Sequence, residues 1–183
     1  MKTVLVISSS LRANSNSEAL ADAFARGAAD AGNRVEKVTL KEKDIRFCKG
    51  CLACLRTQRC AIADDAPAIA ERMREADAIA FSTPIYYYGM SGQLKTLLDR
   101  ANPLYSSDYR FRDIYMLTSA AENSPSTPER AVAGLTGWID CFAKARLAGT
   151  VFAGGVDDAG DIEGHNTRAR IQGRQLHKIT RRI

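Results

Sequence analysis

An apolar run near the start of the chain already points to a class of fold. Residues 2–8 read KTVLVIS, a β-branched stretch without polar alternation, which is typical of a strand buried on both faces. After a polar turn, apolar residues recur at helical spacing over residues 20–31 and end at Gly32-Asn33, a common stop signal. We therefore expect a strand, a loop and a helix in that order, with the strand in the middle of a sheet.

The same alternation continues along the rest of the chain. Further strands are predicted at residues 35–40, 78–82, 114–118 and 147–153, and further helices at residues 65–76, 90–101, 129–145 and 165–182. Because strands and helices alternate, the prediction is an α/β fold with a doubly wound five-stranded parallel sheet. Sheets of this kind bind ligands outside the carboxyl ends of their strands.

Length and charge narrow the class of protein further. The chain has 183 residues, so we expect one domain over residues 1–183, with a cysteine-rich loop at residues 48–60. No apolar run approaches the roughly 18 residues of a membrane span, and residues 3–7 are too short for a signal peptide. A cytoplasmic protein that does not bind membranes is expected. Six Lys or Arg and no acid lie in residues 164–183, so the net charge of +5 does not predict nucleic-acid binding.

The loop after the first predicted strand has the chemistry of an anion site. Residues 8–17 read SSSLRANSNS, in which seven of the ten are Ser or Asn and Arg12 is the only charged residue. Backbone N–H groups at the start of a helix, several hydroxyls and one guanidinium together suit a phosphate dianion. The loop has no glycine, so it matches neither a Walker loop nor a GxGxxG motif. The alternative is an ordinary polar turn in which Ser17 caps the helix.

Two more strand ends suit a flat heterocycle. Residues 83–92 follow the third predicted strand and place Tyr86, Tyr87 and Tyr88 in a loop instead of the core. Tyrosines offer planar faces with polar tips. Residues 118–121 read TSAA, which would let a ring lie close to the main chain. The alternative is that one or two of the tyrosines pack under the loop.

Two of these segments resemble motifs of a known family. Residues 9–17 are similar to the GSPRxxxNT phosphate loop of the NAD(P)H-dependent FMN reductase family, and residues 84–100 resemble its flavin-ring loop and the following helix. Residues 160–165 are also similar, so the resemblance spans nearly the whole chain. Ser9 stands where the family often has Gly, and Leu11 stands where it has Pro. The turn is therefore expected to differ slightly from that of the family.

The resemblance implies a flavodoxin-like fold with strand order 2-1-3-4-5 and tightly bound FMN. The residues it places on the phosphate are Ser10, Arg12, Asn16 and Ser17. Those it places around the ring are Pro84, Ile85, Tyr86, Tyr87, Tyr88, Ser119, Ala120 and Ala121. The implied function is an FMN-dependent oxidoreductase: NAD(P)H passes a hydride to FMN, and an unidentified acceptor takes the electrons. No catalytic side chain is nominated, because the flavin supplies the chemistry.

The family commonly completes its flavin pocket with a neighbouring subunit. A homodimer or homotetramer is therefore expected here. The contact surface that we expect consists of residues 89–92 and residues 105–111, the second of which is rich in aromatic residues.

Four cysteines form a second candidate site. Cys48, Cys51, Cys54 and Cys60 follow a C-x2-C-x2-C-x5-C spacing. Thiolates in this number suit a [4Fe-4S] cluster or tetrahedral zinc, although a zinc ribbon usually separates two cysteine pairs by a longer spacer. Free or redox-active thiols are the third alternative. The pattern resembles the compact motif of the iron-sulfur flavoproteins, which implies an electron-transfer carrier as the alternative function.

Three further predictions concern residues outside these candidate sites. Cys141 lies on a predicted helix between Trp138 and Phe142 and is expected to be a buried core thiol. Asp64-Asp65 is interpreted as a cap of the following helix and not as a metal site. His165 and His177 have no carboxylate or cysteine at ligand spacing and are interpreted as structural or surface residues.

Overall fold

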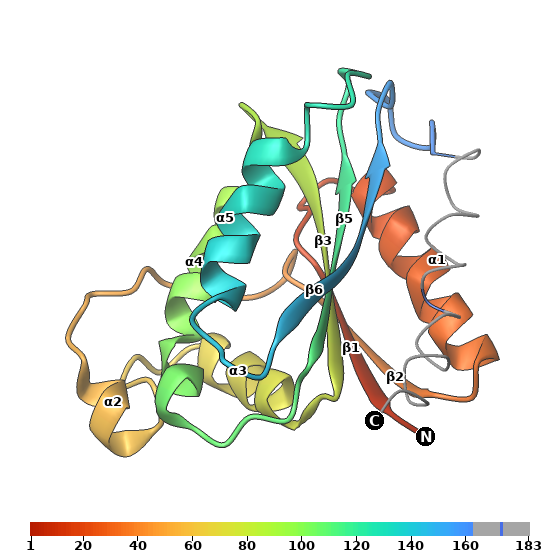
Figure 1. The fold of residues 1–183 in the computed structure, drawn as a ribbon. Coiled ribbons are helices and arrows are strands. Elements are labelled where there is room, and N and C mark those ends of the chain that lie inside the picture. Colours follow the sequence, from red (N-terminus) through yellow and green to blue (C-terminus); the bar gives the residue numbers. More distant parts are fainter. Residues whose placement is uncertain (163–172, 174–183) are drawn as a thin grey trace.

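The computed structural model describes residues 1–162 and 173, and Figure 1 shows a central sheet with helices on both faces. The parallel strands are β1 (Thr3–Ser8), β2 (Arg34–Thr39), β3 (Ala78–Tyr86), β5 (Asp113–Ser119) and β6 (Arg146–Ala153). They lie in the order β2-β1-β3-β5-β6, and the two-residue β4 (Gly89–Met90) pairs antiparallel with β3. Without β4 this is the order 2-1-3-4-5, so the predicted five-stranded parallel sheet and its flavodoxin-like arrangement are confirmed.

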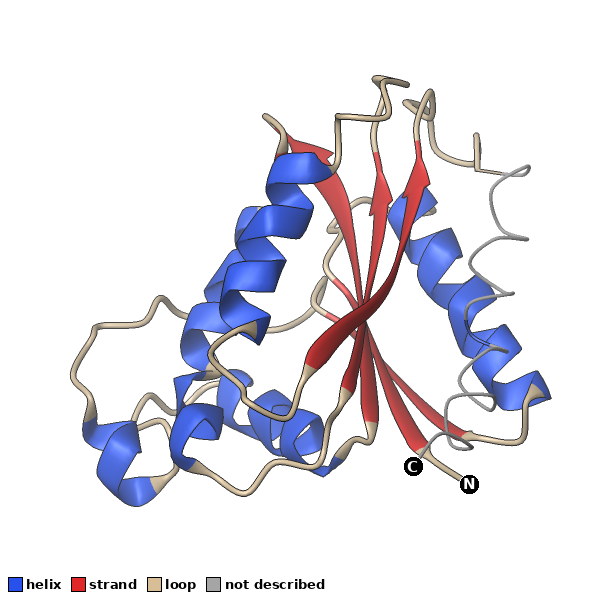
Figure 2. Ribbon diagram, viewed as in Figure 1, coloured by secondary structure: helices blue, strands red, loops and turns tan. Residues whose placement is uncertain are grey.

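β1 lies inside the sheet and sends alternate side chains into two cores. Leu5 and Ile7 pack in the core under α3 (Ala66–Glu75), α4 (Gly92–Arg100) and α5 (Glu129–Ile139), whereas Val4 and Val6 pack in the core under α1 (Asn16–Asp30). Figure 2 shows these helices on opposite faces of the sheet. The four side chains are at most 1% exposed. Burial on both faces explains why residues 2–8 show no polar alternation.

The two ends of the molecule carry different candidate sites. The carboxyl ends of the strands meet at the upper end of Figure 1, where the predicted phosphate and ring loops lie. The cysteine loop lies at the opposite end, where α2 (Ala53–Thr57) packs against the 3-10 helix η1 (Asn102–Ser106).

The predicted end of the third strand is wrong. β3 continues to Tyr86, because Ile85 pairs with Met90 and Tyr86 pairs with Gly89 of β4. Pro84 therefore still pairs with Ser119 of β5, whereas Ile85 and Tyr86 extend β3 past that pairing, and the turn that follows is formed by Tyr87 and Tyr88.

The predicted end of the fifth helix is also wrong. α5 ends at Ile139, and the chain then turns so that the Phe142 ring packs 4.6 Å from Trp138 and 5.3 Å from Phe111 between ring centroids. Cys141 is consequently exposed on this turn and is not the buried core thiol that was expected. The same cluster buries Tyr109 and Phe111, so residues 105–111 do not form the exposed aromatic surface that was expected.

The helix predicted over residues 165–182, with His165 and His177, lies outside the described residues. Among the helices that are described, none is long and apolar enough to cross a membrane.

Candidate functional site

The loop between β1 and α1 holds the predicted anion site. Ser15 caps α1, because its hydroxyl accepts a hydrogen bond from the Glu18 amide at 3.1 Å. The interpretation of Ser17 as the cap is therefore wrong; Ser17 lies in the first turn and is 1% exposed. The first amides of a helix have no partner within it and carry partial positive charge, so this end of α1 favours an anion.

A chain of buried hydroxyls fixes this loop to its neighbours. The Ser91 hydroxyl donates to Ser9 Oγ (2.9 Å), and the Ser9 hydroxyl donates to the Ser82 carbonyl (3.1 Å). The Ser82 hydroxyl donates to the Ser17 carbonyl (2.5 Å), which joins the end of β3 to the start of α1. Ser82 and Ser91 are not among the predicted site residues, although Ser82 ends a predicted strand and Ser91 stands directly before a helix. Satisfied buried networks of this kind hold loops in one geometry.

Two predicted phosphate ligands also contact the loop after β6. Arg12 Nη1 donates to the Asp157 carbonyl at 2.6 Å, and Asn16 Nδ2 donates to the Asp158 carbonyl at 2.8 Å. The Gly160 amide donates to Asn16 Oδ1 at 3.2 Å. Because the Arg12 side chain is about half exposed (52%) and a guanidinium has five N–H groups, it keeps donors for a ligand. Our sequence analysis had not expected Asp157 or Asp158 beside this site.

One pocket joins the three predicted loops. Its lining includes the predicted residues Ser10, Arg12, Asn16, Ser17, Pro84, Ile85, Tyr86, Ser119 and Ala120. Strand pairing brings them together, since Pro84 lies opposite Ser119 across β3 and β5. The pocket encloses about 70 Å³. Pockets that enclose a whole small-molecule ligand measure roughly 300–1,000 Å³, so this one has room for only part of such a ligand.

Tyr87, Tyr88 and Ala121 do not line this pocket. Tyr87 and Tyr88 are the central residues of the turn between β3 and β4, with φ of 50° and 63°, the left-handed region that a two-residue hairpin turn requires. Tyr87 is fully exposed. A hydrogen bond to the Glu122 carboxylate raises the pKa of Tyr88, and the Arg130 guanidinium lies 5.5 Å from its ring centroid. Tyr87 and Tyr88 thus follow Tyr86 in the sequence, and Tyr86 is the residue of this turn region that lines the pocket.

The four predicted metal ligands share a second, much smaller hollow. Cys48, Cys51, Cys54 and Cys60 line it together with residues of α4 and η1. By the chemical type of their donor atoms, four soft thiols suit an iron-sulfur cluster or zinc. The hollow measures only about 30 Å³, however, and within residues 1–162 and 173 no three Cys, His, Asp or Glu side chains are placed to hold one metal ion. The donor set fits the predicted cluster, but its arrangement in this structure does not.

Arg100 is a residue of this region that our sequence analysis missed. It is fully buried and forms an ion pair with the buried carboxylate of Asp64 at 2.6 Å. Burial acts to raise the pKa of Asp64, but hydrogen bonds from Arg100 and from the amides of Arg46 and Ala66 lower it to about 2. The Ala66 amide, the first of α3, donates to Asp64 Oδ1 at 3.1 Å, so the Asp64 side chain satisfies an amide at the start of the helix. Asp65 is the N-cap residue of α3, as expected, although its side chain makes no cap hydrogen bond.

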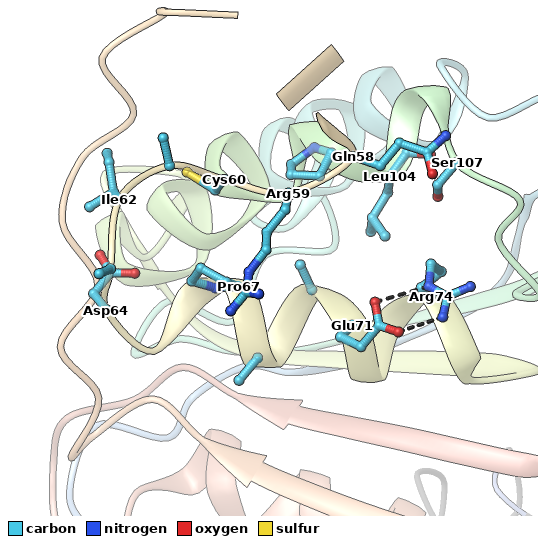
Figure 3. A pocket seen from close by; sticks show the side chains of 15 residues that line it. Gln58, Arg59, Cys60, Ile62, Asp64, Pro67, Glu71, Arg74, Leu104 and Ser107 are labelled. Atoms are coloured by element: carbon cyan, nitrogen blue, oxygen red, sulfur yellow. Dashed lines mark hydrogen bonds and ion pairs between the residues drawn. The ribbon is translucent and has the colours of Figure 1, made fainter. Parts of the chain in front are cut away.

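A larger pocket of about 820 Å³ lies beside α3, away from the strand ends. Figure 3 shows it beneath the segment that carries Arg59 and Cys60, with Glu71 joined to Arg74 by a hydrogen bond of 2.9 Å. It shares no lining residue with the pocket at the strand ends. Size alone does not identify a site, and we place the candidate cofactor site at the strand ends because the loops with anion and ring chemistry converge there.

Comparison with known proteins identifies the family that this chain resembles. A family model described as NADPH-dependent FMN reductase matches residues 2–156. The chain is 38% identical over 101 residues to an iron-sulfur flavoprotein of Methanocaldococcus jannaschii, covering 55% of this chain and 52% of that one. It is 26% identical over 151 residues to an iron-sulfur flavoprotein of Methanosarcina thermophila, covering 82% and 79%. The match thus spans about half the length of the first of these relatives.

Solved structures share the fold. An NAD(P)H:quinone oxidoreductase from Methanothermobacter marburgensis superposes with a TM-score of 0.75 at 21% identity, covering 96% of each chain. An azoreductase from Bacillus anthracis superposes with a TM-score of 0.71 at 18% identity, covering 97% of this chain and 100% of that one.

Proposed function

The chain belongs to the NADPH-dependent FMN reductase family, and from this premise we propose that it is an FMN-dependent oxidoreductase that takes electrons from NAD(P)H and passes them to an acceptor. The observation that carries the proposal is the pocket at the strand ends, in which nine of the twelve predicted flavin residues line one space. When bound, FMN accepts a hydride and releases electrons, and the protein supplies binding and orientation.

Each part of the pocket has a separate task in this proposal. The hydroxyls of Ser10 and Ser17 and the first amides of α1 bind the phosphate, and Arg12 adds the positive charge that offsets a dianion. Pro84–Tyr86 and Ser119-Ala120 form the wall beside the ring. The turn with Tyr87 and Tyr88 stands at the rim, where a nicotinamide or an acceptor would approach. No side-chain acid or base is required for hydride transfer to the flavin.

The experiment that tests this proposal measures FMN content and NAD(P)H oxidation of the purified chain. We expect a yellow protein that releases FMN on denaturation and oxidises NADH or NADPH when an acceptor such as a quinone or an azo compound is supplied. A protein that neither contains nor takes up FMN would refute the proposal. FMN binding without steady-state oxidation of either nucleotide would instead support an electron carrier.

A second candidate function is an iron-sulfur flavoprotein that transfers electrons through a [4Fe-4S] cluster. It is favoured by the four cysteines around one hollow and by the names of the relatives. After anaerobic reconstitution we expect about four iron per chain, and replacing any of Cys48, Cys51, Cys54 or Cys60 by Ser should remove most of it. Cys141→Ser is the matched control, because Cys141 is an exposed thiol beyond α5. Iron near zero with normal flavin would leave a plain FMN reductase.

A further inference from the structure

The pocket beside α3 is built from two separate parts of the chain. Residues 58–64 pass over one side of it, and residues of α3 and η1 line the other side (Figure 3). Its volume of about 820 Å³ lies within the roughly 300–1,000 Å³ of pockets that enclose a small molecule. Among the described residues, none lines both this pocket and the one at the strand ends. The proposed FMN site therefore does not account for it.

Hydrogen bonds hold the segment over the pocket at both of its ends. Gln58 Nε2 donates to the Ser106 carbonyl at 3.0 Å, which joins the start of the segment to η1. Near the other end, Arg100 Nη2 donates to the Ile62 carbonyl at 3.3 Å. A pocket that is formed before its ligand arrives costs less conformational entropy on binding. These two contacts thus favour the binding of a small ligand here.

Most of the surface that a ligand would contact is apolar. Eight of the fifteen lining residues are Ala, Ile, Leu or Pro. Leu104 and Ala70 are 2% and 5% exposed, so a ligand that reaches them is removed from water on that side. Removal of apolar surface from water is the main favourable term in most associations. The body of a ligand for this pocket is therefore apolar.

The two carboxylates in the lining are already paired with arginines. Asp64 forms its ion pair with Arg100, and both side chains are fully buried. Glu71 accepts a hydrogen bond of 2.9 Å from Arg74 Nε (Figure 3). Arg74 also lies 3.7 Å from the Glu75 carboxylate. The negative charges in the lining are thus offset, and so is the positive charge of Arg74.

Arg59 is the charged residue of the lining that forms no ion pair in the described part of the chain. Figure 3 shows its side chain extending from the segment over the pocket towards α3. The hydrogen bond from Arg74 lowers the pKa of Glu71, and the positive charge of Arg59 adds to this shift, so the Arg59 guanidinium lies within electrostatic reach of α3. A guanidinium in this position offers a planar fork of N–H donors to an anion in the pocket.

We propose that this pocket binds a small organic monocarboxylate, with its apolar body against α3 and η1 and its carboxylate on the guanidinium of Arg59. Arginine and carboxylate match in geometry, because two parallel N–H···O bonds join them. One negative charge is favoured over two, because the Glu71 carboxylate lies near the same guanidinium. The pocket is separate from the FMN site, so this inference does not depend on the proposed function.

Calorimetric titration of FMN-loaded protein with 2-naphthoate tests the proposal, because bound FMN keeps this probe out of the pocket at the strand ends. Arg59→Met should weaken binding about five-fold, as expected when an exposed ion pair worth about 1 kcal/mol is lost. Arg56→Met is the matched control and should bind the probe as the wild type does, because Arg56 is exposed on α2 and does not line the pocket. The uncharged analogue 2-naphthamide should bind the wild type and Arg59→Met equally.

Two results of this titration would overturn the proposal. One is the absence of saturable 2-naphthoate binding at millimolar concentration. The other is an equal loss of affinity in Arg59→Met and Arg56→Met, which would show a response to the net charge of the protein and not to a contact in the pocket.

A second measurement locates the probe. Cys60 lines the pocket and is half-buried, so bound 2-naphthoate should slow its alkylation, followed by mass spectrometry. Cys141, an exposed thiol beyond α5, should react at an unchanged rate. Ala68→Trp adds a large ring to the lining from α3 and should abolish both the binding and the protection of Cys60, with normal FMN content.

Binding that leaves the Cys60 rate unchanged, or that survives Ala68→Trp, would place the probe elsewhere and overturn the proposal. The same titration and alkylation can be made on protein that takes up no FMN. A failure of the FMN site and a failure of this second site are therefore observed separately.

Discussion

Arg12 is the residue on which the proposed anion site depends most, and the structure gives it two partners. Its guanidinium already donates to the Asp157 carbonyl and lies 3.9 Å from the Asp158 carboxylate. These contacts hold the side chain beside Ser10 and Asn16 at the pocket. In the proposed function the exposed N–H groups would bind the phosphate, so the residue would join loop and ligand.

Arg12→Ala should therefore weaken FMN more than riboflavin. A charge-assisted hydrogen bond contributes roughly 1.5–3 kcal/mol, so the dissociation constant of FMN should rise about 10-fold to 150-fold. Riboflavin, which lacks the phosphate, should be nearly unaffected. Fluorescence titration of both ligands measures this, with the exposed Arg26→Ala on α1 as control. Equal losses for both ligands would show that Arg12 holds the loop and does not bind the phosphate.

The Asp64–Arg100 pair predicts a pH-dependent stability. The pKa of Asp64 lies at about 2, below its ordinary 3.8, so its contribution is complete above about pH 4 and is lost as the pH falls through 2. A shift of nearly two units corresponds to about 2 kcal/mol. Asp64→Asn should lower the free energy of unfolding by at least about that amount at neutral pH, because Arg100 then stays buried without its partner.

Denaturant unfolding of Asp64→Asn and wild type at several pH values checks this prediction. The difference between the two should shrink as the pH falls from about 4 towards 2. Asp99→Asn is the control, because Asp99 pairs with Lys95 on the surface of α4 and such exposed pairs contribute only about 0.3–0.5 kcal/mol. A difference that is constant across this range would mean that the carboxylate charge is not what stabilises the loop.

Among the elements, the β3–β4 hairpin has a strained backbone at its turn, and the two tyrosines of that turn are exposed to solvent. Its turn uses Tyr87 and Tyr88, although Asn-Gly is the pair that this turn prefers. Left-handed backbone at a non-glycine residue costs roughly 1–2 kcal/mol each. Such strain is often retained at functional sites, and here it presents two rings beside the pocket wall.

Replacing Tyr87-Tyr88 by Asn-Gly should raise the stability of the protein and slow its oxidation of NAD(P)H. We expect stability to rise by about 1 kcal/mol, because the relief of strain outweighs the loss of two Tyr88 contacts: that with Arg130, worth roughly 0.5–1 kcal/mol, and the hydrogen bond to Glu122, worth roughly 0.5–1.5 kcal/mol. FMN should still bind through the phosphate loop, while NAD(P)H oxidation slows. Thermal unfolding, FMN titration and steady-state rates test the three statements. Unchanged oxidation would mean that the tyrosines do not serve the ring site.

For the whole molecule, exposed apolar side chains lie next in sequence to residues that line the pocket at the strand ends. Tyr87 is fully exposed and Leu11, in the phosphate loop, is 46% exposed. Tyr105 is also exposed, but Tyr109 and Phe111 are buried, so residues 89–92 remain from the surface expected for association. The exposed side chains of Tyr87 and Leu11 are added to that surface here. A second subunit placed there would cover the rim of the pocket, which is where the proposed function puts the flavin ring.

We expect sedimentation at micromolar concentration to show a dimer or a tetramer. Tyr87→Lys should weaken this association by about tenfold or more, since exposed aromatic residues at interface centres contribute most to binding. Tyr105→Lys is the matched control, because Tyr105 is an exposed tyrosine on η1, which packs against α2. A fully active monomer would contradict the expectation.

Local sequence was enough to determine the fold class and the chemistry of the loops. Strand periodicity and helix spacing depend on neighbours along the chain, and so do the Ser and Asn content of residues 8–17 and the spacing of the cysteines. The order of the five parallel strands came from a family resemblance and agrees with the structure.

The tertiary structure alone decided which groups meet. Asp64 and Arg100 are 36 positions apart, Cys54 and Asn102 are 48 apart, and Arg12 reaches a carbonyl 145 positions away. It also decided that β3 extends to Tyr86 and that α5 stops at Ile139, where packing of one aromatic ring outweighs the helical pattern. Such contacts depend on how strands pair and helices pack across the sheet, and the free energy of burial that selects them is a property of the assembled core and not of any short segment.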